Sequence, residues 1–368
     1  MSSFGKLYKI TTYGEPHGKS VGVIIEGMPS NFFVDLYDIQ RQLNRRKPGQ
    51  NHLTTPRTET DTIEIQSGLD NGFSLGTPIC AIVKNRDVKP QDYQFLPNIR
   101  VPRPSHTDLT YLKKYKIHAS SGGGGGRSSA RETIARVIGG AVAERWLKAK
   151  HGIEIVAWVS QIGDIKFNID EAIFLSKTLL NREIVDTYST RCPNSLKSME
   201  MEKLIMKMKE EGNSIGGVVS CVCRNVPIGL GEPCFDKLEA MLAHAMMSIP
   251  ATKGFEIGSG FKSAEMTGSV HNDLFEWNNR TETLNTKTNY SGGIQGGISN
   301  GSYITFNVAF KPPTTISMPQ QTCDILGNTI ILEAKGRHDP CVVNRAVPIV
   351  ESMAALVLMD ATLQQLGK

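Results

Sequence analysis

A run of five glycines, Gly122 to Gly126, leads through Arg127-Ser128-Ser129 directly into a pattern typical of a helix. Ser129-Ala130-Arg131-Glu132 matches a capping box, and apolar residues then recur at helical spacing from Ile134 to Trp146. Glycines let backbone N–H groups approach a ligand closely, and a helix N-terminus offers unpaired donors with a partial positive charge. The pattern therefore predicts either an anion-binding loop or a flexible surface loop before a capped helix, and by itself it leaves both open.

Neither of two common nucleotide-binding patterns accompanies this loop. The glycine run lacks the Gly-x-x-x-x-Gly-Lys-Ser/Thr order of a P-loop, and no Gly-x-Gly-x-x-Gly separates a predicted strand from a predicted helix. An ordinary Rossmann dinucleotide site is therefore not expected. Arg127 and Arg131, which flank the helix start, could instead hold a phosphate or a carboxylate through paired hydrogen bonds.

The rest of the chain alternates between short strands and longer helices. Strands are predicted over residues 7–12, 21–26, 62–66, 78–84, 153–162, 216–226 and 303–310. Helices are predicted over about 36–46, 129–151, 235–248 and 348–364. Hairpin-like strands with long helices between them indicate an α+β fold rather than a parallel doubly wound sheet. No sharp boundary and no repeat of solenoid length divides the chain, so we expect one domain over residues 1–368.

Composition narrows the class of protein. The net charge of +5 is too small to indicate nucleic acid by itself, although it suits anionic small molecules if the positive charges cluster. There is no signal-peptide pattern, and no apolar run approaches the roughly 20 residues needed to span a bilayer. The seven cysteines include no Cys-x-x-Cys pair, which predicts reduced thiols and no metal site. We therefore expect a cytoplasmic protein without a membrane partner.

Several polar residues stand in loops next to helix-breaking residues. Each of the four basic ones is, alone, more typical of a solvated loop than of a site, and only their shared context raises their interest: Arg46, Arg103, Lys311 and Arg337. His17 and His106 lie beside glycine or proline, where a histidine could transfer a proton near neutral pH. Asp339 precedes Pro340 in the order of a helix N-cap, a purely structural alternative to any chemical role.

These segments together resemble one protein family. The motifs that carry the resemblance, in chain order, are Gly14-Glu15-x-His17-Gly18, Arg45-Arg46-x-Pro48-Gly49, Arg103-Pro104-x-His106-x-Asp108, Gly-Gly-Gly-Arg127-Ser128-Ser129-Ala130-Arg131-Glu132-Thr133, Gly229-Leu230-Gly231-Glu232-Pro233, Asn289 to Gly301, Gly336-Arg337-His338-Asp339-Pro340 and Arg345-Ala346-Val347-Pro348. They resemble chorismate synthase motifs in order from Gly5 to about residue 360, which is almost the whole chain.

The resemblance implies a fold, a reaction and partners. The fold would be a single domain with helices sandwiched between two antiparallel β-sheets, without a separate flavin reductase domain, assembled as a homotetramer. The reaction would be the 1,4-anti elimination of phosphate from 5-enolpyruvylshikimate-3-phosphate to give chorismate, the last common step of the shikimate pathway. The C6–H bond is not acidic, so reduced FMN would assist without net redox change. An external flavin reductase or NADPH would supply the electrons.

The resemblance also implies roles for individual residues. His17 would protonate the departing phosphate, His106 would keep the reduced flavin suitably protonated, and Asp339 would assist proton removal. The residues implied to hold the substrate are Arg46, Arg103, Ser129, Arg131 and Arg337. Those implied to contact FMN are Arg127, Ser128, Ser129, Pro250, Ala251, Gly297, Lys311, Pro312, Pro313, Thr314, Thr315 and Arg337.

Three departures from the family pattern and two alternatives accompany this interpretation. Pro16 stands where a serine is usual, His52 stands where some members have an arginine that could contact a nicotinamide nucleotide, and the glycine run is two residues longer. A flavin-independent phosphate-handling enzyme on the same fold is the first alternative. An anion- or RNA-binding protein is the second, but with only 7% aromatic residues and no interleaved basic and aromatic pattern, nucleic acid is not an expected partner.

Overall fold

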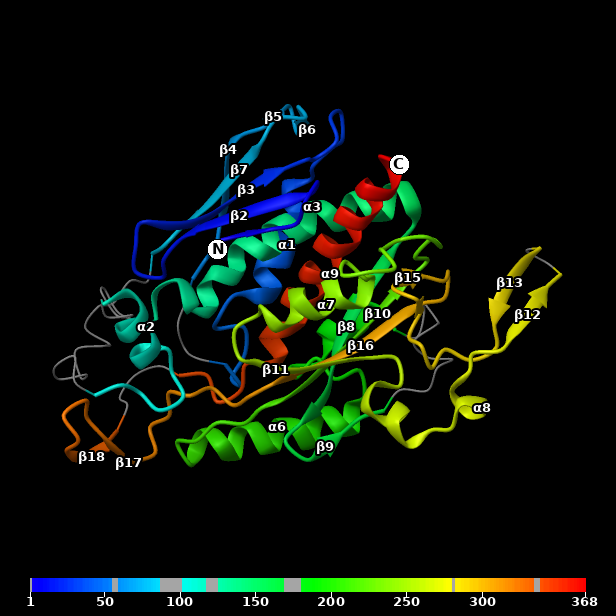
Figure 1. Ribbon diagram of the computed structural model, residues 1–368. Helices are drawn as coiled ribbons and strands as arrows, with labels where there is room; N and C mark the ends of the chain where they lie inside the picture. Colours follow the sequence, from blue (N-terminus) through cyan, green and yellow to red (C-terminus); the bar gives the residue numbers. More distant parts are fainter. Residues whose placement is uncertain are drawn as a thin grey trace.

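The computed structural model describes residues 2–54, 59–86, 101–116, 125–168, 180–279, 282–333 and 338–368. Within these residues the chain builds two five-stranded antiparallel sheets on either side of a layer of helices (Figure 1). The first sheet has the strand order β1-β2-β3-β7-β4, and the second has the order β11-β16-β10-β8-β9. The predicted sandwich of helices between two antiparallel sheets is confirmed.

The predicted strands agree with the structure to within a few residues. The first sheet is formed by β1 (Ser3–Phe4), β2 (Lys9–Gly14), β3 (Ser20–Glu26), β4 (Ile63–Ser67) and β7 (Ile79–Lys84). The second is formed by β8 (Glu154–Ile162), β9 (Ile165–Lys166), β10 (Gly217–Arg224), β11 (Thr252–Ile257) and β16 (Ile304–Phe310). Along β16 every second residue is buried, so its apolar face packs on the helical layer as a strand period of two requires.

The helical layer contains α1 (Leu36–Arg46), α3 (Thr133–His151), α7 (Leu238–Met247) and α9 (Val343–Leu366). Helices α3 and α9 cross in close contact at the centre of the layer. A Cβ atom added to Gly140 would lie 2.4 Å from the Ser352 Cβ of α9, so glycine is required for this approach. Helix α3 ends at residue 151, as the sequence predicted, and Gly152 follows it in the left-handed conformation with a φ of 68°.

Helix α9 begins earlier than the sequence suggested, because Pro348 lies inside it and not at its start. A proline in a helix removes the N–H that would bond the carbonyl four residues earlier. That carbonyl belongs to Asn344, and it accepts a hydrogen bond from Arg191 Nη1 at 2.5 Å instead. A hydrogen bond from the Arg191 side chain therefore replaces the lost backbone hydrogen bond. The local sequence pattern could not predict this contact between distant residues.

By length and hydropathy α9 is long and apolar enough to cross a membrane. However, 89% of its most apolar 18-residue stretch is buried inside the fold, as in the core helix of a globular domain. The buried carboxylate of Glu351 in this helix is paired. Arg45 of α1 and Arg182 both contact it, and the backbone N–H of Ala157 on β8 donates to it at 3.0 Å. A buried charge is tolerated only with such partners, and these tie α9 to the second sheet.

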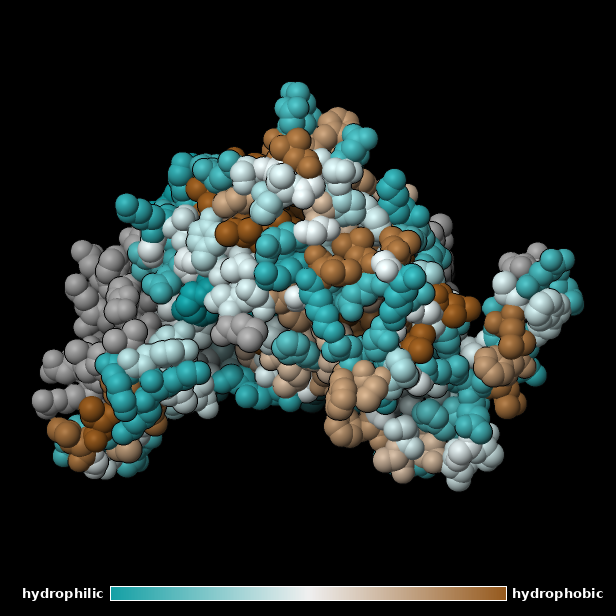
Figure 2. All heavy atoms as spheres, turned by 45° about the horizontal axis from the view of Figure 1, so that its top comes forward, coloured by the Kyte–Doolittle hydropathy of each residue, from teal (hydrophilic) through white to brown (hydrophobic). Residues whose placement is uncertain are grey.

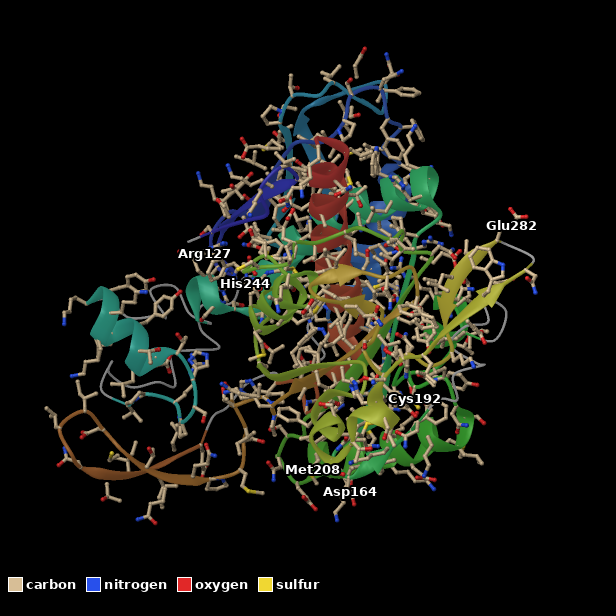
Figure 3. The ribbon with its side chains drawn as sticks, turned by 45° about the vertical axis from the view of Figure 1, so that its right-hand side comes forward. Arg127, Asp164, Cys192, Met208, His244 and Glu282 are labelled. Atoms are coloured by element: carbon tan, nitrogen blue, oxygen red, sulfur yellow. The ribbon has the colours of Figure 1, made fainter. Side chains whose placement is uncertain are left out.

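Smaller elements lie outside the sandwich. They are β5 (Leu69–Asp70), β6 (Phe73–Ser74), α2 (Asp108–Tyr115), α5 (Arg182–Thr187), α6 (Ser195–Glu210), α8 (Gly268–His271), β12 (Phe275–Asn278), β13 (Thr283–Thr286), β14 (Ile294–Gln295), β15 (Ile298–Ser299), β17 (Gln320–Cys323), β18 (Thr329–Leu332) and 3₁₀ turns at Gly126–Ser128, Ala130–Glu132 and Gly260–Glu265. Helix α2 and the β17–β18 hairpin lie on the same side of the body (Figures 1 and 3).

Candidate functional site

Three arginines from the ends of three helices converge at one edge of the helical layer. Arg46 ends α1, Arg131 lies in the 3₁₀ turn before α3, and Arg345 lies in the first turn of α9. Asp61 binds two of them, because it accepts from Arg46 Nη2 at 2.6 Å and from Arg131 Nη1 at 3.0 Å. Arg345 Nε in turn donates to the Arg46 carbonyl at 3.3 Å. One buried carboxylate thus holds two guanidinium groups in fixed positions.

Asp61, Glu59 and Asp339 pair with the three arginines, but these carboxylates do not use every guanidinium donor. Burial, and then repulsion from Arg345 and Arg131, lowers the pKa of Arg46 to about 10, although Asp61 opposes the shift. Arg46 Nε and Arg131 Nη2 are buried donors without a hydrogen-bond partner among the described residues, and Glu59 lies 3.6 Å from the latter. Buried donors of this kind are rarely left unsatisfied. The cluster is therefore suited to bind an anion.

A cavity of about 80 Å³ opens beside these arginines. Arg46 and Arg345 form one side, while Pro250, Ala251 and Phe310 contribute an apolar side. The Ala251 carbonyl accepts from the Lys311 N–H at 2.9 Å, so the 250–251 turn and the segment after β16 are held together. Ligand pockets usually exceed about 300 Å³, so this cavity is suited to enclose only part of a ligand.

The second group of predicted residues surrounds Asp108 at the start of α2. Arg103 donates to both of its carboxylate oxygens, at 2.8 and 3.0 Å, and His106 Nδ1 lies 2.8 Å from Oδ1. Burial raises the pKa of Asp108, but hydrogen bonds from His106 and Arg103 outweigh it and hold that pKa well below the usual range. An ionised carboxylate only accepts, so Nδ1 of His106 must carry a proton.

This arrangement leaves the other nitrogen of His106 facing the glycine loop. A Cβ atom added to Gly125 would lie 3.4 Å from His106 Nε2, so the missing side chain of the glycine leaves room there. Lys311 Nζ donates to the Ser105 carbonyl at 2.9 Å, and Arg103 Nη1 lies 3.5 Å from Thr315 Oγ1. The structure therefore brings together the predicted residues of the 103–106, 125–129, 250–251 and 311–315 segments.

His17 lies half-buried in the turn between β2 and β3, which Arg127 and Asn85 both contact, and Asn85 links this turn to Arg131 of the arginine cluster. Arg127 donates to the carbonyl of Gly14 at 2.8 Å and to that of Thr12 at 3.0 Å; Figure 3 shows it beside the end of the first sheet. Asn85 donates to the carbonyls of the turn and accepts from Arg131. Arg127 is thus engaged with the protein backbone.

The predicted capping box is only partly present. Ser129 Oγ does accept an N–H, but from Arg131 at 3.3 Å, and the side chain of Glu132 does not return to Ser129. Glu132 instead accepts from Thr12 Oγ1 at 2.8 Å and from Arg136 Nε at 2.9 Å. Tertiary contacts to β2 therefore outweigh the local pattern. Ser128 Oγ likewise donates to the Gly125 carbonyl at 2.6 Å and closes the loop.

The capping hypothesis for Asp339 is wrong. Helix α9 begins at Val343 with Val342 as its N-cap, so Asp339 lies outside the helix and Pro340 is not its first residue. The Asp339 carboxylate pairs with Arg345, and both side chains are mostly buried. The structure thus places Asp339 next to the arginine cluster rather than on the backbone donors of a helix end.

Some predicted residues lie elsewhere. The Gly297 carbonyl accepts from Leu238 at the start of α7, whereas Pro250 and Ala251 follow the end of that helix, which is about 15 Å long at ten residues. Gly297 is therefore not brought into the arginine cluster within one chain. His52 pairs with Glu202 at 2.6 Å on the surface. Arg337 lies outside the described residues.

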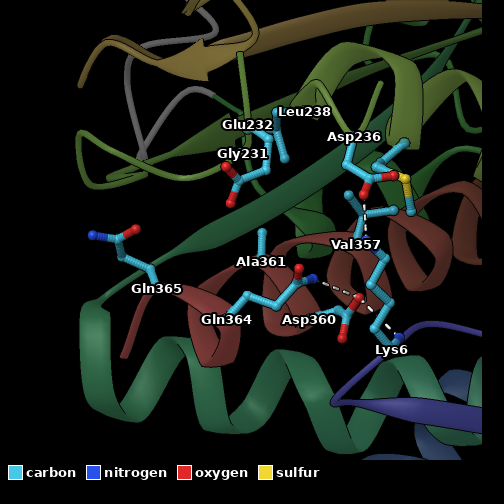
Figure 4. Close-up of a pocket in the computed structure, with 11 residues that line it drawn as sticks. Lys6, Gly231, Glu232, Asp236, Leu238, Val357, Asp360, Ala361, Gln364 and Gln365 are labelled. Carbon is cyan, nitrogen blue, oxygen red and sulfur yellow. Dashed lines mark hydrogen bonds and ion pairs between the residues drawn. The ribbon is translucent and has the colours of Figure 1, made fainter. Parts of the chain in front are cut away.

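A second pocket lies near the other end of α9 and has a structural role (Figure 4). Its volume is only about 20 Å³, enough for little more than one water molecule. Asp360 there accepts from the backbone N–H groups of Lys6, Leu7 and Tyr8, so it fixes the N-terminal segment to α9. Among the residues the structure describes, no group of three or more potential ligands is arranged to hold a metal ion.

Sequence reasoning missed the roles of five residues that shape the site: Glu59, Asp61, Asn85, Asp108 and Arg345. Asp108 and Arg345 stood inside recognised motifs without an assigned role, so the motifs themselves were a usable signal for them. Nothing in the local pattern marks Glu59, Asp61 or Asn85, because their importance arises from contacts with residues between 15 and 72 positions away. Such contacts are visible only in the folded chain.

Comparison with known proteins supports one family. Residues 8–363 match the protein family described as chorismate synthase. The chain is 57% identical to a chorismate synthase of Saccharomyces cerevisiae, covering 99% of this chain and 97% of that protein. It is 54% identical to a chorismate synthase of Schizosaccharomyces pombe, covering 99% and 96%. A crystal structure of a chorismate synthase matches with a TM-score of 0.77 and 32% identity, covering 99% of this chain and 94% of that one.

Proposed function

This chain belongs to the chorismate synthase family, and we propose that its reaction depends on reduced FMN bound beside the arginine cluster. The protein is a lyase that eliminates phosphate from 5-enolpyruvylshikimate-3-phosphate to give chorismate, the last common step of the shikimate pathway. The observation that supports the location is the pair of unsatisfied buried donors on Arg46 and Arg131. A substrate with a phosphate and two carboxylates would satisfy such donors.

The residues around the cavity fit a flavin. Ile249, Pro250 and Phe310 offer an apolar surface for a ring system, and Lys311 follows Phe310 directly in the chain. Burial lowers the pKa of Lys311, and repulsion from Lys253 lowers it further. A negatively charged ligand at this position would therefore be stabilised. When bound, reduced FMN would supply a transient electron and a proton acceptor for a C–H bond that is not acidic.

The residues of this chain would orient the substrate and transfer protons. Arg46, Arg131 and Arg345 would orient the substrate anions and exclude water from them, together with Arg337 as the family resemblance implies. His17 would deliver a proton to the departing phosphate. His106, with its ring fixed by Asp108, would hold a proton on Nε2 toward the flavin. Asp339, fixed by Arg345, would receive a proton on its carboxylate.

Asp339→Asn separates the structural role of Asp339, its pairing with Arg345, from its proposed role as a proton acceptor. Asparagine keeps an oxygen that can accept from Arg345, but it cannot take up a proton. We expect turnover to fall at least about tenfold. We expect the thermal midpoint to fall by only about 2–4 °C, because asparagine still accepts a hydrogen bond from Arg345. FMN binding, followed by flavin fluorescence, should be retained, and full turnover in the variant would remove Asp339 from the reaction.

The same proposal includes a homotetramer. Large apolar side chains are exposed on the projecting β12–β13 hairpin, where Phe275 and Trp277 are each 59% exposed and Leu284 is 52% exposed (Figure 2). Exposed apolar groups on a projecting arm are typical of contact surfaces between subunits. Light scattering should report four copies of the chain, and a stable, active monomer would contradict the proposal.

We further propose that the electrons come from outside this domain, from a flavin reductase or from NADPH. His52 does not supply a permanent positive charge for a nicotinamide nucleotide, and Glu202 already binds it. All seven cysteines are free thiols, which suits a reducing compartment, and we place the reaction in the cytoplasm on that ground.

A further inference from the structure

We propose that Asn85 is a positioning residue that fixes the His17 turn relative to the anion-binding Arg131. The inference rests on the proposed roles of His17 and Arg131, and it adds a residue that connects them. Asn85 follows β7 directly, and its side chain reaches Arg131 in the turn that precedes α3. Its side chain contacts both groups at once.

The amide of Asn85 uses its acceptor and its donors for different parts of the site. Oδ1 accepts from Arg131 Nε at 2.5 Å. Nδ2 donates to the carbonyls of Glu15 at 2.8 Å and Gly18 at 2.7 Å, which flank His17 on both sides. The backbone N–H of Asn85 also donates to the Lys19 carbonyl at 3.1 Å. One planar group therefore links the turn of the proton donor to the guanidinium that would hold the anion.

The chemistry of the elimination explains why such a link matters. A proton can reach the departing phosphate only if the histidine and the bound anion keep a fixed separation, and an error of about 1 Å can cost about 100-fold in rate. The turn lies beyond Gly14 and Val21, the last residues that pair β2 with β3, so the hydrogen bonds between these strands do not fix it. Arg127 fixes its first end at Gly14, and Asn85 fixes the remainder.

Asn85→Asp separates the two halves of this contact. The aspartate keeps an oxygen that can accept from Arg131, but it replaces the donor to Glu15 and Gly18 with an oxygen that faces two carbonyl oxygens. Arg131 is therefore still held, while the His17 turn is released. We expect kcat to fall at least about tenfold with KM changed by less than about threefold. Asn85→Ala removes both contacts, and we expect it to lower kcat and raise KM.

A double-mutant cycle with His17→Ala distinguishes positioning from a general loss of structure. If Asn85 acts through His17, Asn85→Asp should lower kcat at least about tenfold in the parent protein and less than about twofold in the His17→Ala protein. Hydrogen exchange of the backbone amides in residues 14–19 should be faster in both Asn85 variants, even if either is destabilised. Equal losses of kcat in both backgrounds, or unchanged exchange of the turn, would overturn the positioning role and leave His17 and Arg131 as proposed. Full activity of His17→Ala itself would remove the proton donor and overturn both proposals.

Discussion

Replacing His17 or His106 with alanine is expected to lower kcat by roughly 10²–10⁴-fold, the scale for loss of a positioned acid or base. The two variants differ in what they leave behind. His17→Ala removes an imidazole from a turn that Arg127 and Asn85 hold through backbone carbonyls, so the turn itself should persist. His106→Ala removes one of the partners of Asp108, and Arg103 remains bound to both carboxylate oxygens.

Steady-state kinetics with reduced FMN in excess would measure both effects. His151→Ala is a matched control, because this histidine lies at the end of α3 against Trp146 and takes no part in the site. We expect that control to keep the parent kcat. Parent kcat in His17→Ala or in His106→Ala would remove the respective histidine from the reaction, since a required proton donor cannot be omitted without a loss of rate.

Replacing Arg131 is expected to produce the largest change in KM. A buried anion that loses one partner of a charge-assisted pair loses about 2–5 kcal/mol of binding. Arg131→Ala should also lower stability, because Asp61 and Glu59 are fully buried and would each lose a partner. Arg131→Lys is the sharper variant, since one ammonium group keeps the charge but cannot contact Asp61, Asn85 and an anion together.

We therefore expect Arg131→Lys to raise KM at least about tenfold with a smaller loss of thermal midpoint than Arg131→Ala. Arg145→Ala, on the helix α3 that follows Arg131, is the matched control, because Arg145 is partly exposed and pairs with Asp38 away from the cavity. Its KM should be unchanged. An Arg131→Lys variant with the parent KM would show that this guanidinium holds the protein together and does not bind substrate.

The architecture was predictable wherever the local pattern agreed with the final structure. The alternation of β16, the apolar stripe of α3 and the left-handed Gly152 all act within one element, where period and capping decide the outcome. The errors arose where a tertiary contact outweighed a local rule. Pro348 predicted a helix start, but it lies inside α9, where Arg191 donates to the Asn344 carbonyl that the proline cannot bond. Glu132 was predicted to cap the helix, but its carboxylate accepts from Thr12 instead.

The candidate site divides in the same way. Arg46, Arg103, Arg131 and His106 were predictable because they stand in stiff loops or at helix ends, where chemistry-bearing residues are often placed. Their partners were not, because Asp61, Asn85 and Arg345 reach the site through contacts between distant segments. Gly297 illustrates the opposite case, since its motif resembles the family but its position in one chain is at the far end of α7.

The most direct test of this account is an anaerobic assay of the full chain with 5-enolpyruvylshikimate-3-phosphate, followed by the appearance of chorismate. Parallel reactions would contain reduced FMN, oxidised FMN without reductant, and no flavin. We predict turnover with reduced FMN alone and no net oxidation of the flavin after many turnovers. Full turnover with oxidised FMN or without flavin would contradict the account and would indicate a flavin-independent phosphate-handling enzyme on the same fold.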